Sequence, residues 1–121
     1  MTYLAHKPYN SLKKKKINTS FIFQDDTHPS GVALINVDAL GENCIAVAPG
    51  ANNALQAGEV LHAFQELTAN DIVLIQLEIP MTTVEAAIEN AFQKKAKIIL
   101  NPAPAALLKA AILKYLYLIT P

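Results

Sequence analysis

The stretch that decides the fold covers residues 72–101, which read IVLIQLEIPMTTVEAAIENAFQKKAKIILN. Its two apolar runs, Ile72–Leu77 and Lys97–Leu100, have the length of buried strands. Between them, Thr82–Glu85 matches the capping-box pattern that opens a helix. The apolar side chains that then share one helix face are Val84, Ala87, Ile88, Ala91 and Phe92. Because a connection of this length is a crossover, the segment predicts two parallel strands with a helix between them.

The same alternation extends on both sides of this stretch. Residues 56–68 have apolar side chains at helical spacing, and residues 105–113 predict another helix after two prolines. Tyr115–Ile119 predicts a third strand. The order is therefore αβαβαβ, which indicates an α/β fold with a parallel sheet and flanking helices. The strands are apolar at successive positions, as in a sheet that is covered on both faces.

The residues before this domain predict antiparallel strands. Ser20–Gln24, Gly31–Val37 and Asn43–Ala48 are three short apolar runs separated by turn residues, and strands this close in sequence pair antiparallel. Val32–Val37 is apolar at nearly every position, so we expect both of its faces to be covered at least in part. Ser11–Lys16 resembles the polar end of a helix.

Composition excludes several classes of protein. With 121 residues, 52% hydrophobic and 17% charged, the chain has room for one domain and is too apolar to be mostly disordered. Residues 1–16 hold five lysines and no acidic residue, whereas residues 17–121 hold five lysines and ten acidic residues. There is no arginine, the residue best suited to gripping bases and phosphates, so we expect no nucleic-acid partner.

The chain also lacks the signals of a membrane or secreted protein. Its longest uncharged stretch, Asn43–Gly58, contains proline, glycine and three asparagines, so we expect no membrane span. No secretory signal opens the sequence. The single cysteine, Cys44, excludes an internal disulfide and fits a reducing cytosol. We therefore expect a cytoplasmic protein.

Candidate functional side chains follow the three predicted parallel strands. Glu78, Asn101 and Thr120 each end a strand, with a proline close behind. Ligands of open α/β sheets bind at this edge, and a carboxylate suits a sugar because it accepts hydrogen bonds from hydroxyl groups. Glu78 is therefore either a sugar-binding residue or a solvated strand end. Asn101 and Thr120 are interpreted as turn and capping residues rather than ligands.

Other candidates are weaker. Gly50–Asn53 is interpreted as a loop with a helix N-cap rather than as an anion-binding turn, and Cys44 as a residue packed in the core. Lys13–Lys16 is read as a solvated helix end rather than a contact to lipid or RNA. The histidines lack the spacing of metal ligands; they are His6, His28 and His62.

Six motifs, in order and at matching spacing, resemble the ribokinase-like carbohydrate kinases from about Ser11 to Pro121. They are Gly31-Val-Ala-Leu-Ile-Asn-Val37, Gly41-Glu-Asn43, Gly50-Ala-Asn52, Gln76-Leu-Glu78-Ile-Pro80, Asn101-Pro-Ala-Pro-Ala105 and Ile119-Thr-Pro121. This family transfers the γ-phosphoryl group of ATP to a sugar hydroxyl with Mg²⁺. The resemblance implies a partial ribokinase-like fold: a parallel sheet with flanking helices plus a small antiparallel β lid.

The resemblance also assigns roles to parts of the chain. Residues 1–16 form a basic N-terminal segment, 17–49 the lid segment, and 50–121 part of the parallel α/β domain. Glu78 matches the family's glutamate that hydrogen-bonds a ribose-like sugar, and Ala33 and Ile35 match lid residues that pack on it. The lid of the family often pairs two subunits, so we expect a homo-oligomer formed through the lid or exposed sheet edges.

Three motifs of the family are not found in this sequence. They are a Gly-Gly-Lys-Gly-Ala-Asn-type loop, which the family carries in its N-terminal portion with a sugar-binding aspartate, the Asn-x-x-Glu that positions phosphate and Mg²⁺, and the Gly-Ala-Gly-Asp that supplies the anion hole and the catalytic base. We therefore expect an internal fragment of a sugar kinase that is inactive alone. The alternatives are one half of a split kinase and a non-enzymatic α/β module for oligomerisation or regulation.

Overall fold

The computed structural model describes residues 6–120, and side-chain exposure from Asn10 onward. The chain divides into two compact units, Met1–Asn52 and Asn53–Pro121. In the first unit, α1 (His6–Lys14) ends in the lysine run, as the sequence predicts, while Met1–Ala5 lie outside the described residues. No helix in the described part of the chain is long and apolar enough to cross a membrane.

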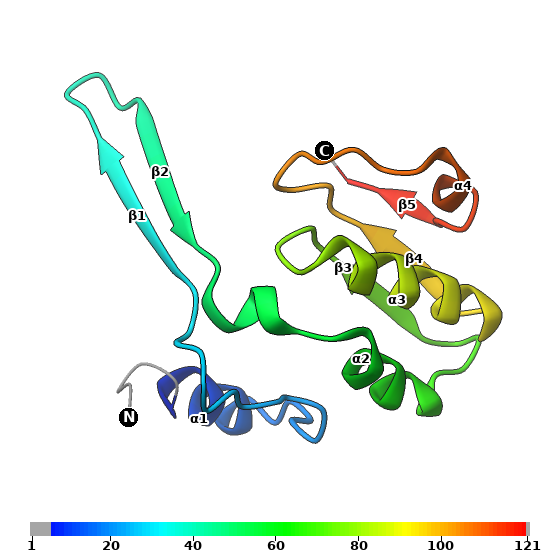
Figure 1. The fold of residues 1–121 in the computed structure, drawn as a ribbon. Helices are drawn as coiled ribbons and strands as arrows, with labels where there is room; N and C mark the ends of the chain where they lie inside the picture. Colours follow the sequence, from blue (N-terminus) through cyan, green and yellow to red (C-terminus); the bar gives the residue numbers. More distant parts are fainter. Residues whose placement is uncertain (1–5, 121) are drawn as a thin grey trace. The chain divides into compact units, whose positions relative to one another are not determined.

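The first unit contains an antiparallel hairpin of β1 (Val32–Val37) and β2 (Asn43–Ala48), shown in Figure 1. Both strands were predicted, and their pairing runs from Val32 opposite Ala48 to Val37 opposite Asn43. The carboxylate of Asp38 shapes the turn because its Oδ1 accepts the backbone N–H groups of Leu40 (2.8 Å) and Glu42 (3.0 Å). Local capture of backbone donors by an aspartate is a common way to fix such a turn.

Two glycines close the base of the hairpin. A Cβ atom on Gly31 would lie 2.8 Å from the carbonyl oxygen of Pro49, and one on Gly50 would lie 2.3 Å from that of Pro29. Gly50 also has a φ of +56°, in the left-handed region that side chains rarely adopt. The backbone N–H of Ala51 donates to the same Pro29 oxygen at 2.8 Å. The two chain segments therefore approach too closely for a side chain at either glycine.

Two predictions about the strands of this unit are wrong. Ser20–Gln24 is not a strand, because polar side chains bind the backbone locally around it: Asn18 Oδ1 accepts the N–H of Ser20 (2.9 Å), and Asp25 Oδ1 accepts that of Thr27 (2.7 Å). The Val32–Val37 strand is not covered either, since all its residues are exposed. A two-stranded hairpin offers neither face a layer to pack against.

The second unit has an α/β architecture. Its elements are α2 (Ala57–Ala63), η2 (Phe64–Glu66), β3 (Ile72–Ile75), α3 (Met81–Gln93), β4 (Lys97–Leu100), α4 (Ala110–Leu113) and β5 (Leu118–Ile119), and η1 (Gly50–Ala54) leads into it. The three strands form one parallel sheet in the order β3-β4-β5. A parallel sheet with crossover helices confirms the predicted fold class.

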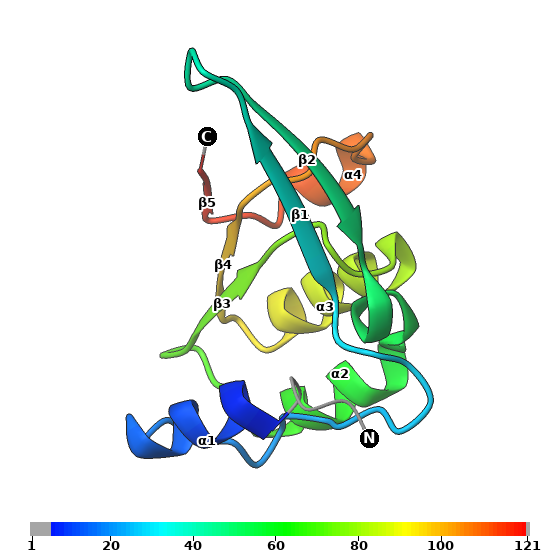
Figure 2. The ribbon, with the colours of Figure 1, turned by 90° about the vertical axis from the view of Figure 1, so that its left-hand side faces the viewer.

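The core of this unit lies between α3 and one face of the sheet, and Figure 2 shows α3 alongside β3 and β4. Its members are Val73, Ile75, Leu77, Val84, Ala87, Ile88, Ala91, Ala96, Ile98, Leu100 and Ile112. The other face of the sheet is open: Ile72 is 63% and Leu74 70% exposed. The expectation that both faces are covered therefore holds for only one of them within the described residues.

The helix that follows β3 starts differently from the sequence prediction. Its N-cap residue is Pro80, so Thr82 lies inside the helix at an exposed position, and the Thr82–Glu85 capping box is not formed. Thr83 is buried instead, and its hydroxyl donates to the carbonyl oxygen of Leu55 at 2.9 Å. Glu85 pairs with Lys109 at 2.7 Å. The start of α3 is therefore held by contacts with distant residues and not by a local capping box.

The last two elements are shorter than predicted. The helix expected over 105–113 is confined to Ala110–Leu113, and the strand expected over 115–119 to Leu118–Ile119. Leu107 is 99% exposed, whereas Leu108 packs against the core, so only part of the predicted apolar face of this helix is covered. Short helices gain most of their stability from such packing. Tyr115 packs on Phe92, with ring centroids 4.4 Å apart, before the strand begins.

Candidate binding edge at the strand ends

The parallel hydrogen-bond ladder continues one residue beyond β4 and β5. The backbone N–H of Asn101 donates to the carbonyl oxygen of Ile75 (2.9 Å), and that of Thr120 to the oxygen of Leu100 (3.0 Å). Because Ile75 pairs with Leu100 and Leu100 with Ile119, Gln76, Asn101 and Thr120 form the next row. Asn101 and Thr120 therefore lie side by side, but the predicted strand Ile72–Leu77 ends already at Ile75, so the third residue of the row is Gln76 and not Glu78.

Glu78 lies two residues beyond this row. It is exposed, and its carboxylate has no hydrogen-bond or ion-pair partner within residues 6–120. The residue before it, Leu77, is buried, and its backbone N–H donates to the carbonyl oxygen of Ala103 at 3.0 Å. This anchor holds the segment after β3 beside the segment after β4, so the free carboxylate belongs to the same edge.

Ala33 and Ile35 lie on β1 in the first unit. They pair with Val47 and Ile45 of β2, and the alternation of strand side chains places these four residues on one face with Val37. All of them are exposed. The hairpin thus presents a continuous apolar surface, which is what contact with the carbon skeleton of a ligand requires. This surface belongs to the first unit, whereas the edge that carries Glu78 belongs to the second.

The weaker candidates form no second site. Cys44 is exposed on β2, so its predicted place in a core is wrong: the hairpin has no covered face. Gly50–Asn53 lies in η1, but the N-cap residue of the next α-helix is Gln56, whose N–H donates to Glu59 Oε2 at 2.8 Å. Within residues 6–120 no group of three histidine, cysteine, aspartate or glutamate side chains is arranged to hold a metal ion.

His28 has a local role. Its Nδ1 lies 2.7 Å from Asp25 Oδ2, while Asp25 Oδ1 accepts hydrogen bonds from Thr27. Hydrogen bonds from the side chain and backbone of Thr27, and then from His28, hold the pKa of Asp25 well below its ordinary value. These contacts fix the loop before β1, so His28 is a loop residue, as the sequence predicts.

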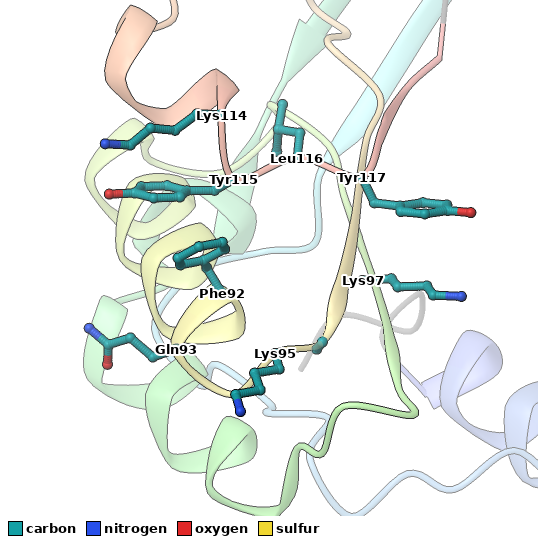
Figure 3. Close-up of a pocket in the computed structure, with 9 residues that line it drawn as sticks. Phe92, Gln93, Lys95, Lys97, Lys114, Tyr115, Leu116 and Tyr117 are labelled. Carbon is teal, nitrogen blue, oxygen red and sulfur yellow. The ribbon is translucent and has the colours of Figure 1, made fainter.

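A groove of about 610 Å³ lies at the opposite end of the parallel sheet (Figure 3). Phe92, Tyr115 and Lys114 lie on one side of it, and Lys97 and Tyr117 on the other. The ammonium groups of Lys97 and Lys114 sit about 5 Å from the ring centroids of Tyr117 and Tyr115. None of the predicted site residues lines this groove, which was not anticipated from the sequence.

Comparisons with known proteins agree with this architecture. The family described as "pfkB family carbohydrate kinase" matches residues 6–121. The chain is 35% identical over 112 residues to the ribokinase of Haemophilus influenzae, covering 93% of this chain and 37% of that protein. It is 37% identical over 112 residues to the ribokinase of Bacillus subtilis, covering 93% and 38%.

Among solved structures, the ribokinase of Thermotoga maritima is similar with a TM-score of 0.75 and 32% identity, over 94% of this chain and 36% of that one. The chain therefore spans a little over a third of the length of the relatives it matches.

Proposed function

Because the chain belongs to the pfkB family of carbohydrate kinases, we propose that it supplies the sugar-binding edge and the lid of a ribokinase-like kinase. Such a kinase phosphorylates ribose or a related sugar with ATP. In this proposal residues 17–49 form the lid and residues 50–121 part of the sugar-binding domain. Its support is the family match together with ribokinase relatives at about 35% identity.

The observation that carries the proposal is the free carboxylate of Glu78 at the carboxyl edge of a parallel sheet. An ionised carboxylate accepts hydrogen bonds and cannot donate them, so it prefers a ligand that brings O–H groups. Charge-assisted hydrogen bonds of this kind contribute about 1.5–3 kcal/mol each. Glu78 therefore binds and orients the sugar; it is not placed to carry the phosphoryl transfer.

ATP and Mg²⁺ belong to the proposal for the whole kinase rather than to these residues. Glu78 is the one carboxylate at the edge formed by residues 76–80, 101 and 120, and no lysine stands among them. Within the described part of the chain no acidic cluster fits a metal ion. The residues present do not fit a Mg²⁺–nucleotide site, and we derive no catalytic step from them.

The hairpin gives the proposal its second part. The face with Ala33 and Ile35 packs on the sugar, and the opposite face with Val32 and Leu34 pairs with a second copy of the chain. Both faces are apolar and exposed, and surfaces of this kind tend to associate. We place the protein in the cytoplasm, where the exposed Cys44 stays reduced.

Sugar binding is tested on the purified chain by titration with D-ribose. Glu78→Gln keeps the size of the side chain and removes its charge, so we expect ribose binding to weaken roughly 10- to 100-fold. Glu66→Gln, an exposed glutamate in η2, is the matched control and should leave binding unchanged. Equal affinity of the wild type and Glu78→Gln would refute the role of Glu78.

Phosphoryl transfer is tested in a complete kinase. Residues 11–121 would replace the matching segment of the Bacillus subtilis ribokinase, and ribose-dependent ADP release would be measured. We expect the chimera to be active and Glu78→Gln to raise the KM for ribose more than that for ATP. The isolated chain should release no ADP. A chain that self-associates but binds no sugar would instead support an oligomerisation or regulatory module.

A further inference from the structure

Three side-chain oxygen atoms in the described residues are buried without a hydrogen-bond partner: Asn90 Oδ1, Asn101 Oδ1 and Thr120 Oγ1. Burial of a polar atom costs free energy unless a partner replaces the lost water, so such atoms are rare in folded proteins. Asn90 lies within α3. The other two directly follow β4 and β5, at the edge where open α/β sheets bind ligands.

The backbone fixes Asn101 and Thr120 as direct neighbours. Ile99 pairs with Leu118 and Leu100 with Ile119, and the bond from the Thr120 N–H to the Leu100 oxygen extends that register by one residue. Side chains alternate along a strand, so Asn101 and Thr120 share one face of the sheet. It is the face opposite Leu100, which is fully buried in the core with α3.

The chemistry of Asn101, Thr120 and the nearby Glu78 selects a hydroxyl-bearing ligand. Asn101 Oδ1 and the Glu78 carboxylate only accept hydrogen bonds, whereas the Thr120 hydroxyl donates and accepts. A phosphate brings acceptors and negative charge, which Glu78 would repel. A neutral polyol brings O–H groups that satisfy every one of these atoms.

We propose that Asn101 and Thr120 are sugar-binding residues that extend the site of Glu78 across the ends of β4 and β5. Asn101 accepts a hydrogen bond from one sugar hydroxyl, and Thr120 exchanges one with a neighbouring hydroxyl. This inference rests on the proposed sugar-binding function and revises the interpretation of both residues as turn and capping positions. Their two unpartnered oxygens are then binding positions that remain unsatisfied until the sugar arrives.

The inference is tested by titrating the ¹⁵N-labelled chain with D-ribose. We expect the side-chain NH₂ signals of Asn101 and the backbone N–H signal of Thr120 to shift together with those of Leu77 and Glu78. If ribose binds in a Glu78-dependent way while the Asn101 and Thr120 signals stay still, the inference is wrong and the proposed function stands. If no signal responds to ribose, both are wrong.

Thr120→Val separates binding from a structural role. It replaces a buried, unpartnered hydroxyl by a methyl group, so the thermal midpoint of the ligand-free chain should stay the same or rise, while the Kd for ribose rises about 2- to 10-fold. Thr82→Val, at an exposed position of α3, is the matched control and should leave Kd unchanged. A lower midpoint with unchanged ribose affinity would show that the hydroxyl is structural.

Monodeoxy analogues of ribose identify the hydroxyl involved. The wild-type chain should bind one analogue more weakly than ribose, because that analogue lacks the hydroxyl that contacts Thr120. Thr120→Val should bind this analogue and ribose equally, because the variant lacks the side-chain hydroxyl that would distinguish them. Asn101→Ala should do the same for a different analogue. If a variant lowers the affinity for ribose and for every analogue by the same factor, a direct contact with one hydroxyl is contradicted.

Discussion

Thr83→Val tests how α3 is held in the domain. Thr83 is 1% exposed, and its hydroxyl donates to the carbonyl oxygen of Leu55, 28 residues earlier, at 2.9 Å. Valine has almost the same shape, so the change removes the hydrogen bond and leaves the Leu55 oxygen without this donor. A lost hydrogen bond with an unsatisfied partner costs about 1–2 kcal/mol. For a unit of this size the thermal midpoint should fall roughly 5–15 °C.

The assay is thermal and urea unfolding of the chain followed by circular dichroism, with Thr82→Val as the control. Thr82 is the residue that the capping-box pattern selects, but it is exposed in α3. Its replacement should change the free energy of unfolding by less than about 0.5 kcal/mol. If Thr82→Val proves as destabilising as Thr83→Val, a local cap opens the helix and the contact with Leu55 is not what holds it.

Three further predictions concern glycine, charge and the core. Gly50→Ala should destabilise the hairpin base by more than about 1 kcal/mol because Gly50 has a positive φ. Gly58→Ala is the control and should be neutral or stabilising, because Gly58 lies in α2 with open space around it. Hydrogen exchange and thermal unfolding measure the effect of both changes. Hydrogen bonds from Thr68 hold the pKa of Asp71 below its ordinary value, so their stabilisation is present above pH 4 and is lost as the pH falls through the lowered pKa. Thr68→Val should therefore destabilise at pH 7 and less at pH 2, and equal effects at both would contradict the assignment. Ile98→Ala, at a fully buried position, should cost about 2–5 kcal/mol in urea unfolding, and a cost below about 1 kcal/mol would show that the core is loosely packed.

Local pattern predicted the elements whose periodicity extends over several residues. The apolar run of β3, the helical spacing of α3 and the run of β4 each specify one type of structure, and a crossover connection leaves little choice but parallel pairing. The prediction failed where local polar contacts, or the lack of a neighbouring layer, determine the secondary structure. Ser20–Gln24 has the composition of a strand but lies between two side-chain-stabilised turns. Residues 105–109 have the spacing of a helix, but among them only Leu108 packs against the core.

The candidate site also has features that the sequence pattern indicates and features that depend on the fold. The sequence singles out Glu78 as a polar residue that follows a buried strand, and the family resemblance implies a sugar-binding role for it, which stays a prediction. The sequence also singles out Asn101 and Thr120 but assigns them to turn and capping positions. Their unpartnered oxygens depend on the hydrogen bonds that the fold does or does not offer, which is a property of three dimensions.

The sequence by itself therefore determined the αβαβαβ order, the parallel direction of the strands and the edge at which polar residues gather, because each follows from periodicity and chain connectivity. Only the tertiary structure decided that α3 is held through Thr83, that one sheet face and both hairpin faces stay open, and that two oxygens at the strand ends lack partners. These features depend on which distant residues approach one another, and the free energy of such contacts is set by packing between segments rather than by the residues along any one of them.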